Sequence, residues 1–222
     1  MKLSPQKLTL YTVIILAVAL IGLVAWQRLA PGPSDLPAPF AGDFELQDQP
    51  VIGNPDAPVT IVAFEDFKCP VCRAFEEDAY PQIMRELVDT GQAKLHFMNF
   101  QFIGPDSTTA GIAGECAYSQ NPAAFWTYKA YIYRSQGPES ETWATPDHLV
   151  NLARENVPAL DADALAACIE ERRFENAVAA DYELGQRAGV DATPTLFVNG
   201  QKLESWDYAT VEAAVTEAGR ED

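Results

Sequence analysis

Two cysteines, Cys69 and Cys72, carry the most reactive side chains of this sequence. They lie where an apolar, β-branched run (residues 59–64) ends and a helical pattern begins, with Pro70 suited to the first helical position. The start of a helix offers unpaired N–H groups and a positive dipole end, which lower the pKa of a cysteine. Cys69 is therefore predicted to be a nucleophile, and Cys72, about one turn further on, to form a disulfide with it or resolve its mixed disulfides. The same Cys-x-x-Cys spacing also occurs as one half of a four-ligand zinc site, so the spacing alone does not exclude zinc binding.

The charge of the chain is strongly acidic. The formal net charge of the 222 residues is −17, and the first 30 residues hold three basic side chains and no acidic one, which leaves −20 for the rest. Such a surface repels nucleic acid and anionic lipid headgroups. We therefore predict a soluble domain that stands off the membrane surface and binds no nucleic acid.

An uncharged run of 19 residues, 8–26, has about the length of a membrane-spanning helix. Two lysines precede it and one arginine follows closely, so the positive-inside rule puts residues 1–7 in the cytoplasm and the rest of the chain outside. A cleaved signal peptide is the alternative, disfavoured because no small-x-small cleavage site follows the run. We predict a single-pass protein of the cell membrane whose Pro-rich linker, 27–43, tethers an extracytoplasmic domain in an oxidising compartment.

Residues 44–222 have the pattern of a mixed α/β domain. A strand, a helix and a strand form a βαβ unit, and a helical block over about 107–188 separates it from a final hairpin and helix. The predicted strands are 44–51, 59–64, 94–102, 195–198 and 201–203. The cysteines then lie at the carboxyl end of the first buried strand, where open α/β sheets place their sites. Pro81 should kink the helix that follows them.

Short polar residues mark several boundaries of the later elements. Asn121-Pro122 predicts a break between two helices, and Thr145, Asp161 and Asp207 are expected to cap the helices that follow them. Asn199-Gly200 predicts a two-residue hairpin turn. The aromatic residues between positions 125 and 133 are expected to be core.

Thr193-Pro194 directly precedes one of the core strands. Proline has no N–H to give to a sheet ladder, so it belongs at the first residue of a strand. A tight approach at such a position often uses a cis peptide bond. From these residues alone, an ordinary trans proline is the preferred interpretation.

The Cys69-Pro70-Val71-Cys72 turn, the helical block and the segment 189–200 (GVDATPTLFVNG) together resemble the DsbA-like thiol-disulfide oxidoreductases, particularly their membrane-anchored, BdbD-like branch. The resemblance covers roughly residues 45–219. It implies a thioredoxin fold with an inserted helical domain, with Cys69 as the attacking and Cys72 as the resolving cysteine. It also implies that Thr193-Pro194 is a cis-proline dipeptide that packs against the disulfide and offers backbone to a bound peptide.

Two positions depart from that family's pattern. Many relatives bury a carboxylate six residues before the first cysteine as a proton relay, and this chain has Ala63 there. Glu65 and Asp66 lie nearer, but the end of a strand usually exposes such residues, so we expect solvated charges. Strong oxidants of the family carry a histidine between the cysteines, where this chain has Val71. We therefore expect a potential in the middle of the range of roughly −270 to −120 mV.

Cys116 and Cys168 form the other cysteine pair, and both lie in predicted helices with apolar neighbours. In an exported domain an even cysteine count favours a structural disulfide between them, with two separate buried thiols as the alternative. A four-cysteine zinc site is disfavoured because both are isolated, and because the two histidines, His96 and His148, lack ligand spacing. We predict no metal and no cofactor.

The predicted function is disulfide exchange with exported, cysteine-containing proteins. The oxidised Cys69/Cys72 pair accepts attack by a substrate thiol, and a membrane quinone-linked protein would reoxidise the reduced enzyme. Helix-end donors are expected to be the main cause of thiolate stabilisation. Two alternatives stay open: a reductase or isomerase of the same fold, and a non-catalytic substrate-binding chaperone module.

Overall fold

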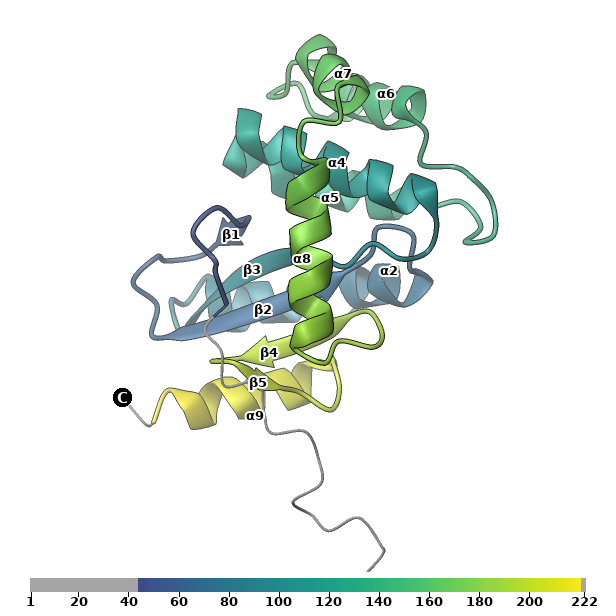
Figure 1. Ribbon diagram of the computed structural model, residues 1–222. Coiled ribbons are helices and arrows are strands. Elements are labelled where there is room, and N and C mark those ends of the chain that lie inside the picture. The colour runs from purple at the N-terminus through teal and green to yellow at the C-terminus, as the bar shows by residue number, and fades with distance from the viewer. Residues whose placement is uncertain (1–43, 221–222) are drawn as a thin grey trace, which may run out of the picture. The chain divides into compact units, whose positions relative to one another are not determined.

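A computed structural model describes residues 44–220 of the chain and shows a five-stranded sheet with helices on both faces (Figure 1). The strand order is β1-β3-β2-β4-β5, in which β2 and β3 are parallel and the other neighbours antiparallel. The strands are β1 (Val51–Ile52), β2 (Val59–Glu65), β3 (Ala93–Asn99), β4 (Thr195–Val198) and β5 (Gln201–Lys202). The first strand is shorter than the predicted 44–51, because residues 47–49 form a turn and a bend instead.

The central strand, β2, is buried on both faces, as its uninterrupted apolar sequence predicts. Ile61 and Ala63 point to the side covered by α2 (Pro70–Glu77) and α9 (Tyr208–Ala218). Val62 and Phe64 point to the opposite side. This alternation follows from the two-residue period of a strand.

The helix after the cysteines breaks into short pieces, as Pro81 predicts. Helix α2 ends at Glu77, α3 (Ala79–Ile83) follows, and the turn from Met84 to Val88 widens into a π-helix. Proline has no N–H and its ring crowds the carbonyl four residues earlier, which here is that of Glu77. The pieces still present Phe75, Ile83 and their neighbours to the sheet.

Five helices lie between β3 and β4, as predicted for the helical block. They are α4 (Pro105–Gln120), α5 (Pro122–Arg134), α6 (Pro146–Asn156), α7 (Ala162–Glu170) and α8 (Glu175–Arg187). The side chains of Thr145, Asp161 and Asp207 accept hydrogen bonds from the first turns of α6, α7 and α9, which confirms the predicted caps. Asn121, predicted only as part of a break between two helices, caps α5 in the same way.

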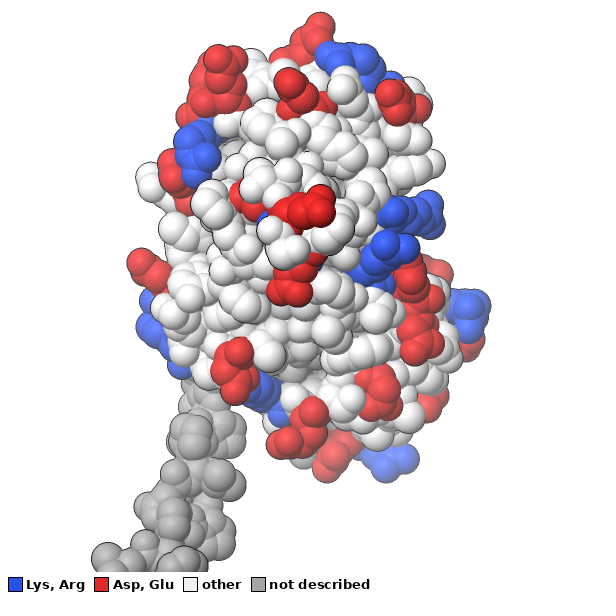
Figure 2. Space-filling model, turned by 90° about the vertical axis from the view of Figure 1, so that its right-hand side faces the viewer, with Lys and Arg blue, Asp and Glu red and all other residues white. Residues whose placement is uncertain are grey.

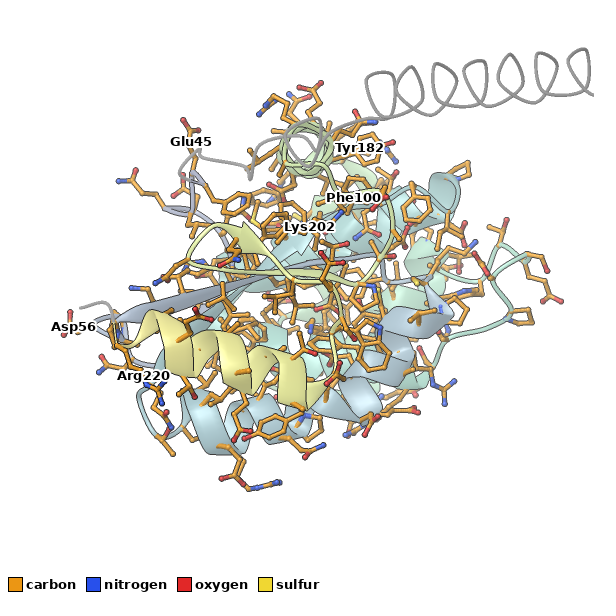
Figure 3. All side chains as sticks on the ribbon, turned by 90° about the horizontal axis from the view of Figure 1, so that it is seen from below. Glu45, Asp56, Phe100, Tyr182, Lys202 and Arg220 are labelled. Carbon is orange, nitrogen blue, oxygen red and sulfur yellow. A yellow bond between two sulfur atoms is a disulfide. The ribbon has the colours of Figure 1, made fainter. Side chains whose placement is uncertain are left out.

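Helix α8 returns the chain from the inserted helices to the sheet and lies against its second face (Figure 1). The ring of Phe100 lies 4.7 Å from that of Tyr182 on α8, and both are labelled in Figure 3. Gly185 allows this close approach, because a Cβ there would lie 2.5 Å from Phe100 Cδ2. The chain turns at Asn199 and Gly200, and both residues have positive φ, as expected for the predicted two-residue hairpin turn between β4 and β5.

Acidic side chains are scattered over the face shown in Figure 2, with basic side chains singly or in small groups beside them. Within residues 44–220, no helix combines the length and the apolarity that a membrane crossing needs. The predicted cytoplasmic segment 1–7, anchor 8–26 and linker 27–43 lie outside the described residues.

Candidate active site

The turn between β2 and α2 holds both cysteines of the CxxC motif. Cys69 is the N-cap residue of α2, with extended backbone angles (φ −70°, ψ 119°), and Pro70 occupies the first helical position. Both cysteines are free thiols in this structure; the exposed fraction is 6% for Cys69 and 0% for Cys72. Cys69 is therefore the sulfur that an incoming molecule reaches, while Cys72 lies beneath it.

Thr193 and Pro194 meet the cysteines across the sheet. Antiparallel pairing places Phe64, near the end of β2, opposite Thr195, the first residue of β4. The thiol of Cys69 donates a hydrogen bond to the carbonyl of Thr193, with Sγ and O 3.3 Å apart. The Thr193-Pro194 bond is cis, so the trans interpretation drawn from the residues alone is wrong. The cis form matches what the family resemblance implies.

The two thiols have opposite electrostatic environments. The pKa of Cys69 is lowered to about 6, chiefly by a hydrogen bond from the Cys72 thiol, against the effect of burial; the side chain of Thr193 and the N–H groups of Cys72 and Val71 contribute less. Burial, followed by the Cys69 sulfur and the charge of Glu65, raises the pKa of Cys72 well above its ordinary value. The helix-end donors thus contribute, but the neighbouring thiol contributes most, which corrects the expectation from sequence. Only Cys69 is a thiolate near neutral pH.

Glu65 and Asp66 are fully buried, so the expectation of solvated charges is wrong. Asp66 accepts hydrogen bonds from the Ser107 hydroxyl and from the N–H groups of Lys68, Phe102 and Ile103. These bonds compensate for its burial and shape the loop before Cys69.

Glu65 belongs to a buried ionic cluster below the cysteines. Its carboxylate lies 3.0 Å from Nζ of Lys129, which also pairs with Glu76, and it accepts a 2.8 Å hydrogen bond from the Tyr133 hydroxyl. Burial raises the pKa of Glu65 to about 7, although the Lys129 charge acts in the other direction. A buried carboxyl group that titrates near neutral pH can take up or give a proton at this place.

Sequence reasoning missed Lys129 and Tyr133. Both lie on α5, in the aromatic stretch that was predicted to be core, and both are buried there. Lys129 Nζ lies within 6 Å of the ring centres of four aromatic residues: Tyr80, Phe97, Trp126 and Tyr133. A single lysine on an otherwise apolar helix face was the signal that a buried acidic partner exists.

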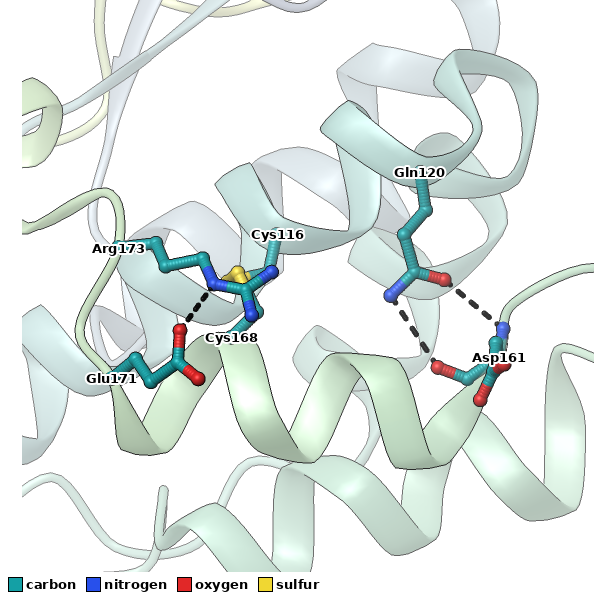
Figure 4. Close-up of a disulfide and its surroundings, with 6 residues drawn as sticks. All are labelled: Cys116, Gln120, Asp161, Cys168, Glu171 and Arg173. Atoms are coloured by element: carbon teal, nitrogen blue, oxygen red, sulfur yellow. Dashed lines mark hydrogen bonds and ion pairs between the residues drawn. A yellow bond between two sulfur atoms is a disulfide. The ribbon is translucent and has the colours of Figure 1, made fainter.

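The second cysteine pair forms the predicted structural disulfide. Cys116 of α4 and Cys168 of α7 form a disulfide within the inserted helices (Figure 4). In the part of the chain that the structure describes, no group of three or more His, Cys, Asp and Glu side chains is placed to hold a metal ion.

Comparison with known proteins agrees with this geometry. The family profile described as thioredoxin matches residues 45–217. The chain is 34% identical over 172 residues to the probable disulfide bond formation protein D of Bacillus anthracis. The aligned segment covers 78% of this chain and 79% of the relative. The chain belongs to the thioredoxin family and is a DsbA-like thiol-disulfide oxidoreductase.

Other DsbA-like proteins show the same relationship. Disulfide bond formation protein D of Bacillus subtilis is 32% identical over 176 residues, 79% of each chain. The crystal structure of oxidised BdbD from Bacillus subtilis superimposes with a TM-score of 0.76 at 31% identity, over 81% of this chain and 97% of that one. The DsbA of Chlamydia trachomatis gives a TM-score of 0.72 at 29% identity, over 78% and 93%. The fold with its helical insertion is therefore that of DsbA.

Proposed function

We propose that this DsbA-like protein introduces disulfides into exported proteins, with Cys69 as the nucleophile and Cys72 as the resolving cysteine. The observation that carries the proposal is the position of Cys69: its sulfur lies at the start of α2 and within hydrogen-bond distance of the cis Thr193-Pro194 segment. The names of the relatives, disulfide bond formation proteins, support the oxidising direction.

The reaction begins with the Cys69–Cys72 disulfide. A substrate thiolate attacks Cys69 Sγ, the bond to Cys72 breaks, and Cys72 leaves as a thiolate that takes up a proton. A second substrate thiolate then attacks the substrate sulfur of the mixed disulfide and releases Cys69 as a thiolate. The substrate has lost two electrons, and the enzyme holds them as two reduced cysteines.

The buried cluster supports the proton step. Cys72 has a raised pKa, so its thiolate must be protonated as it leaves, and Glu65 is electrostatically coupled to it. With a pKa of about 7, Glu65 is able to give that proton and to recover it when the disulfide forms again. The low pKa of Cys69 stabilises the reduced enzyme and so favours transfer of the disulfide to the substrate.

A hollow beside the cis proline supports peptide binding. It has a volume of about 360 Å³, and its lining includes Pro194, Leu196, Leu203 and Trp206. We place the substrate segment along Thr193-Pro194, where its cysteine reaches Cys69.

We infer the site of action from the N-terminal sequence. Residues 8–26 would anchor the chain in the cell membrane with residues 1–7 in the cytoplasm, and the linker 27–43 would hold the catalytic domain outside. A membrane quinone-linked protein would then reoxidise Cys69 and Cys72. The uncharged run and its basic flank support this arrangement.

The test uses the oxidised full chain and a reduced, unfolded protein with two cysteines. We expect the chain to transfer its disulfide stoichiometrically, the Cys69→Ser variant to transfer none, and the thiolate absorbance of the wild type to titrate near pH 6. Titration near the ordinary thiol value of about 8.5 would contradict the nucleophile assignment. An equilibrium with glutathione like that of thioredoxin would favour the reductase or isomerase alternative.

A further inference from the structure

The loop between β2 and Cys69 is held in part by hydrogen bonds to residues that follow β3 in the chain. Phe67 is fully buried in this loop, and its N–H donates to Oε1 of Gln101. The Lys68 ammonium pairs with Asp106 at 2.8 Å and donates to the carbonyl of Glu141. Because the sheet ladder has ended, these contacts help to fix the segment before Cys69.

Gln136 makes the contacts nearest to the reactive cysteine. It follows the end of α5, and its Nε2 donates to the carbonyl of Phe67 at 2.7 Å and to the carbonyl of Cys69 at 3.0 Å. An amide nitrogen has two hydrogens, so both are used. The reverse orientation of the amide would aim its oxygen at two carbonyl oxygens, which fixes the assignment.

We propose that Gln136 is a positioning residue for Cys69, which holds the Cys69 carbonyl so that the sulfur faces its stabilising donors. The proposal rests on the proposed role of Cys69 as the nucleophile. It assigns a redox role to a side chain that comes from the inserted helices and does not touch the sulfur.

The Cys69 carbonyl influences the conformation of Cys69 because it also accepts the first hydrogen bond of α2. The donor of that bond is the N–H of Arg73, at 3.2 Å. With that carbonyl fixed from both sides, Cys69 keeps its extended N-cap conformation. In this conformation Sγ lies near the N–H groups of Val71 and Cys72 and beside Thr193.

Without the Gln136 amide, Cys69 retains only the helical bond at its carbonyl, and the Phe67 carbonyl loses a donor in a buried loop. Rotation of the Cys69 backbone then moves the sulfur away from its donors. Reduced Cys69 loses thiolate stabilisation, and the disulfide becomes relatively more stable. The expected consequence is a weaker oxidant rather than an inactive one.

The chain offers a matched control in Gln120. Its amide also bonds backbone within the inserted helices: Nε2 donates to the carbonyl of Asp161 at 3.4 Å, and Oε1 accepts the N–H of the same residue at 3.0 Å (Figure 4). Substitution of Gln120 removes a comparable pair of bonds without touching the loop before Cys69.

The experiment compares Gln136→Met and Gln120→Met with the wild type in the full chain. For Gln136→Met we expect the pKa of Cys69 to rise by about one unit, and the equilibrium constant for oxidation of glutathione to fall about tenfold. Gln120→Met should leave both quantities at the wild-type values. Gln136→Asn, too short to reach both carbonyls, serves if the methionine variant does not fold.

An unchanged pKa and an unchanged glutathione equilibrium in the folded Gln136 variant would overturn the proposal, even if that variant unfolds more easily. Equal changes in the Gln120 variant would also overturn it, because the effect would then be one of general stability. An ordinary thiol pKa for Cys69 in the wild type is a different result, which overturns the proposed function instead.

Discussion

Replacement of Glu65 by Gln should change how the stability of the protein depends on pH. Glu65 is fully buried, and its pKa rises from the ordinary 4.5 to about 7 on folding. Between these two values the folded protein holds a proton that the unfolded chain has released, so the free energy of unfolding falls as pH rises through this window. At 1.36 kcal/mol per pKa unit, the loss that Glu65 causes is about 3 kcal/mol.

The sign distinguishes this carboxyl group from one that an ion pair dominates. Below pH 4.5 both states are protonated and Glu65 causes no loss; above pH 7 both are ionised and the loss is complete. The Glu65→Gln variant cannot ionise at this position. The free energy of unfolding of the variant relative to the wild type should therefore rise by about 3 kcal/mol between pH 4.5 and 7.5.

The assay is urea unfolding of the reduced full chain at several pH values, with Glu77→Gln as the control. Glu77 lies one residue from Glu76 on the same helix, but its side chain is exposed and pairs with the solvent-accessible Arg73. Because solvent screens such a pair, the effect of Glu77→Gln should be much smaller than that of Glu65→Gln. A Glu65→Gln curve parallel to that of the wild type would refute the reasoning, because Glu65 would then ionise at the same pH whether the chain is folded or unfolded.

Two further predictions concern stability. Replacement of both Cys116 and Cys168 by Ala removes a cross-link between residues 52 positions apart and should lower the free energy of unfolding by about 4 kcal/mol in urea, with no change in the pKa of Cys69. Gly185→Ala should lower the free energy of unfolding by about 1 to 3 kcal/mol, because the added Cβ would lie 2.5 Å from Phe100. In the control Gly219→Ala the nearest atom to the added Cβ is 3.4 Å away, so thermal unfolding should change little. Equal losses of stability in the two variants would contradict the packing argument.

Local signals in the sequence predicted much of the fold and part of the site. The break at Asn121-Pro122, the caps at Thr145 and Asp161 and the turn at Asn199-Gly200 depend on a few adjacent residues, and all occur as expected. The cysteine turn is local in the same sense. A strand that ends where a proline-led helix begins places Cys69 at the helix start without help from the rest of the chain.

The parts that failed depend on partners far away in the chain. Glu65 was expected in solvent because the end of a strand usually exposes such residues. Its buried partner Lys129 lies 64 positions later, among the aromatic residues of α5. The Cys69 carbonyl gave no sign of Gln136, which is 67 positions away. The cis bond at Pro194 lies where the loop before β4 meets the cysteine turn after β2, and residues 193 and 194 alone do not predict that contact.

The disulfide between Cys116 and Cys168 joins two helices of the inserted region, and among residues 44–220 no second disulfide ties that region to the sheet. Noncovalent contacts connect the inserted region to the segment around Cys69, including the Lys68–Asp106 ion pair and the hydrogen bond from the Gln136 amide. A tilt of the inserted region relative to the sheet, when a polypeptide binds, would therefore break only noncovalent contacts, while the Cys116–Cys168 disulfide keeps α4 and α7 joined. Reduction of Cys69 and Cys72 leaves that disulfide intact.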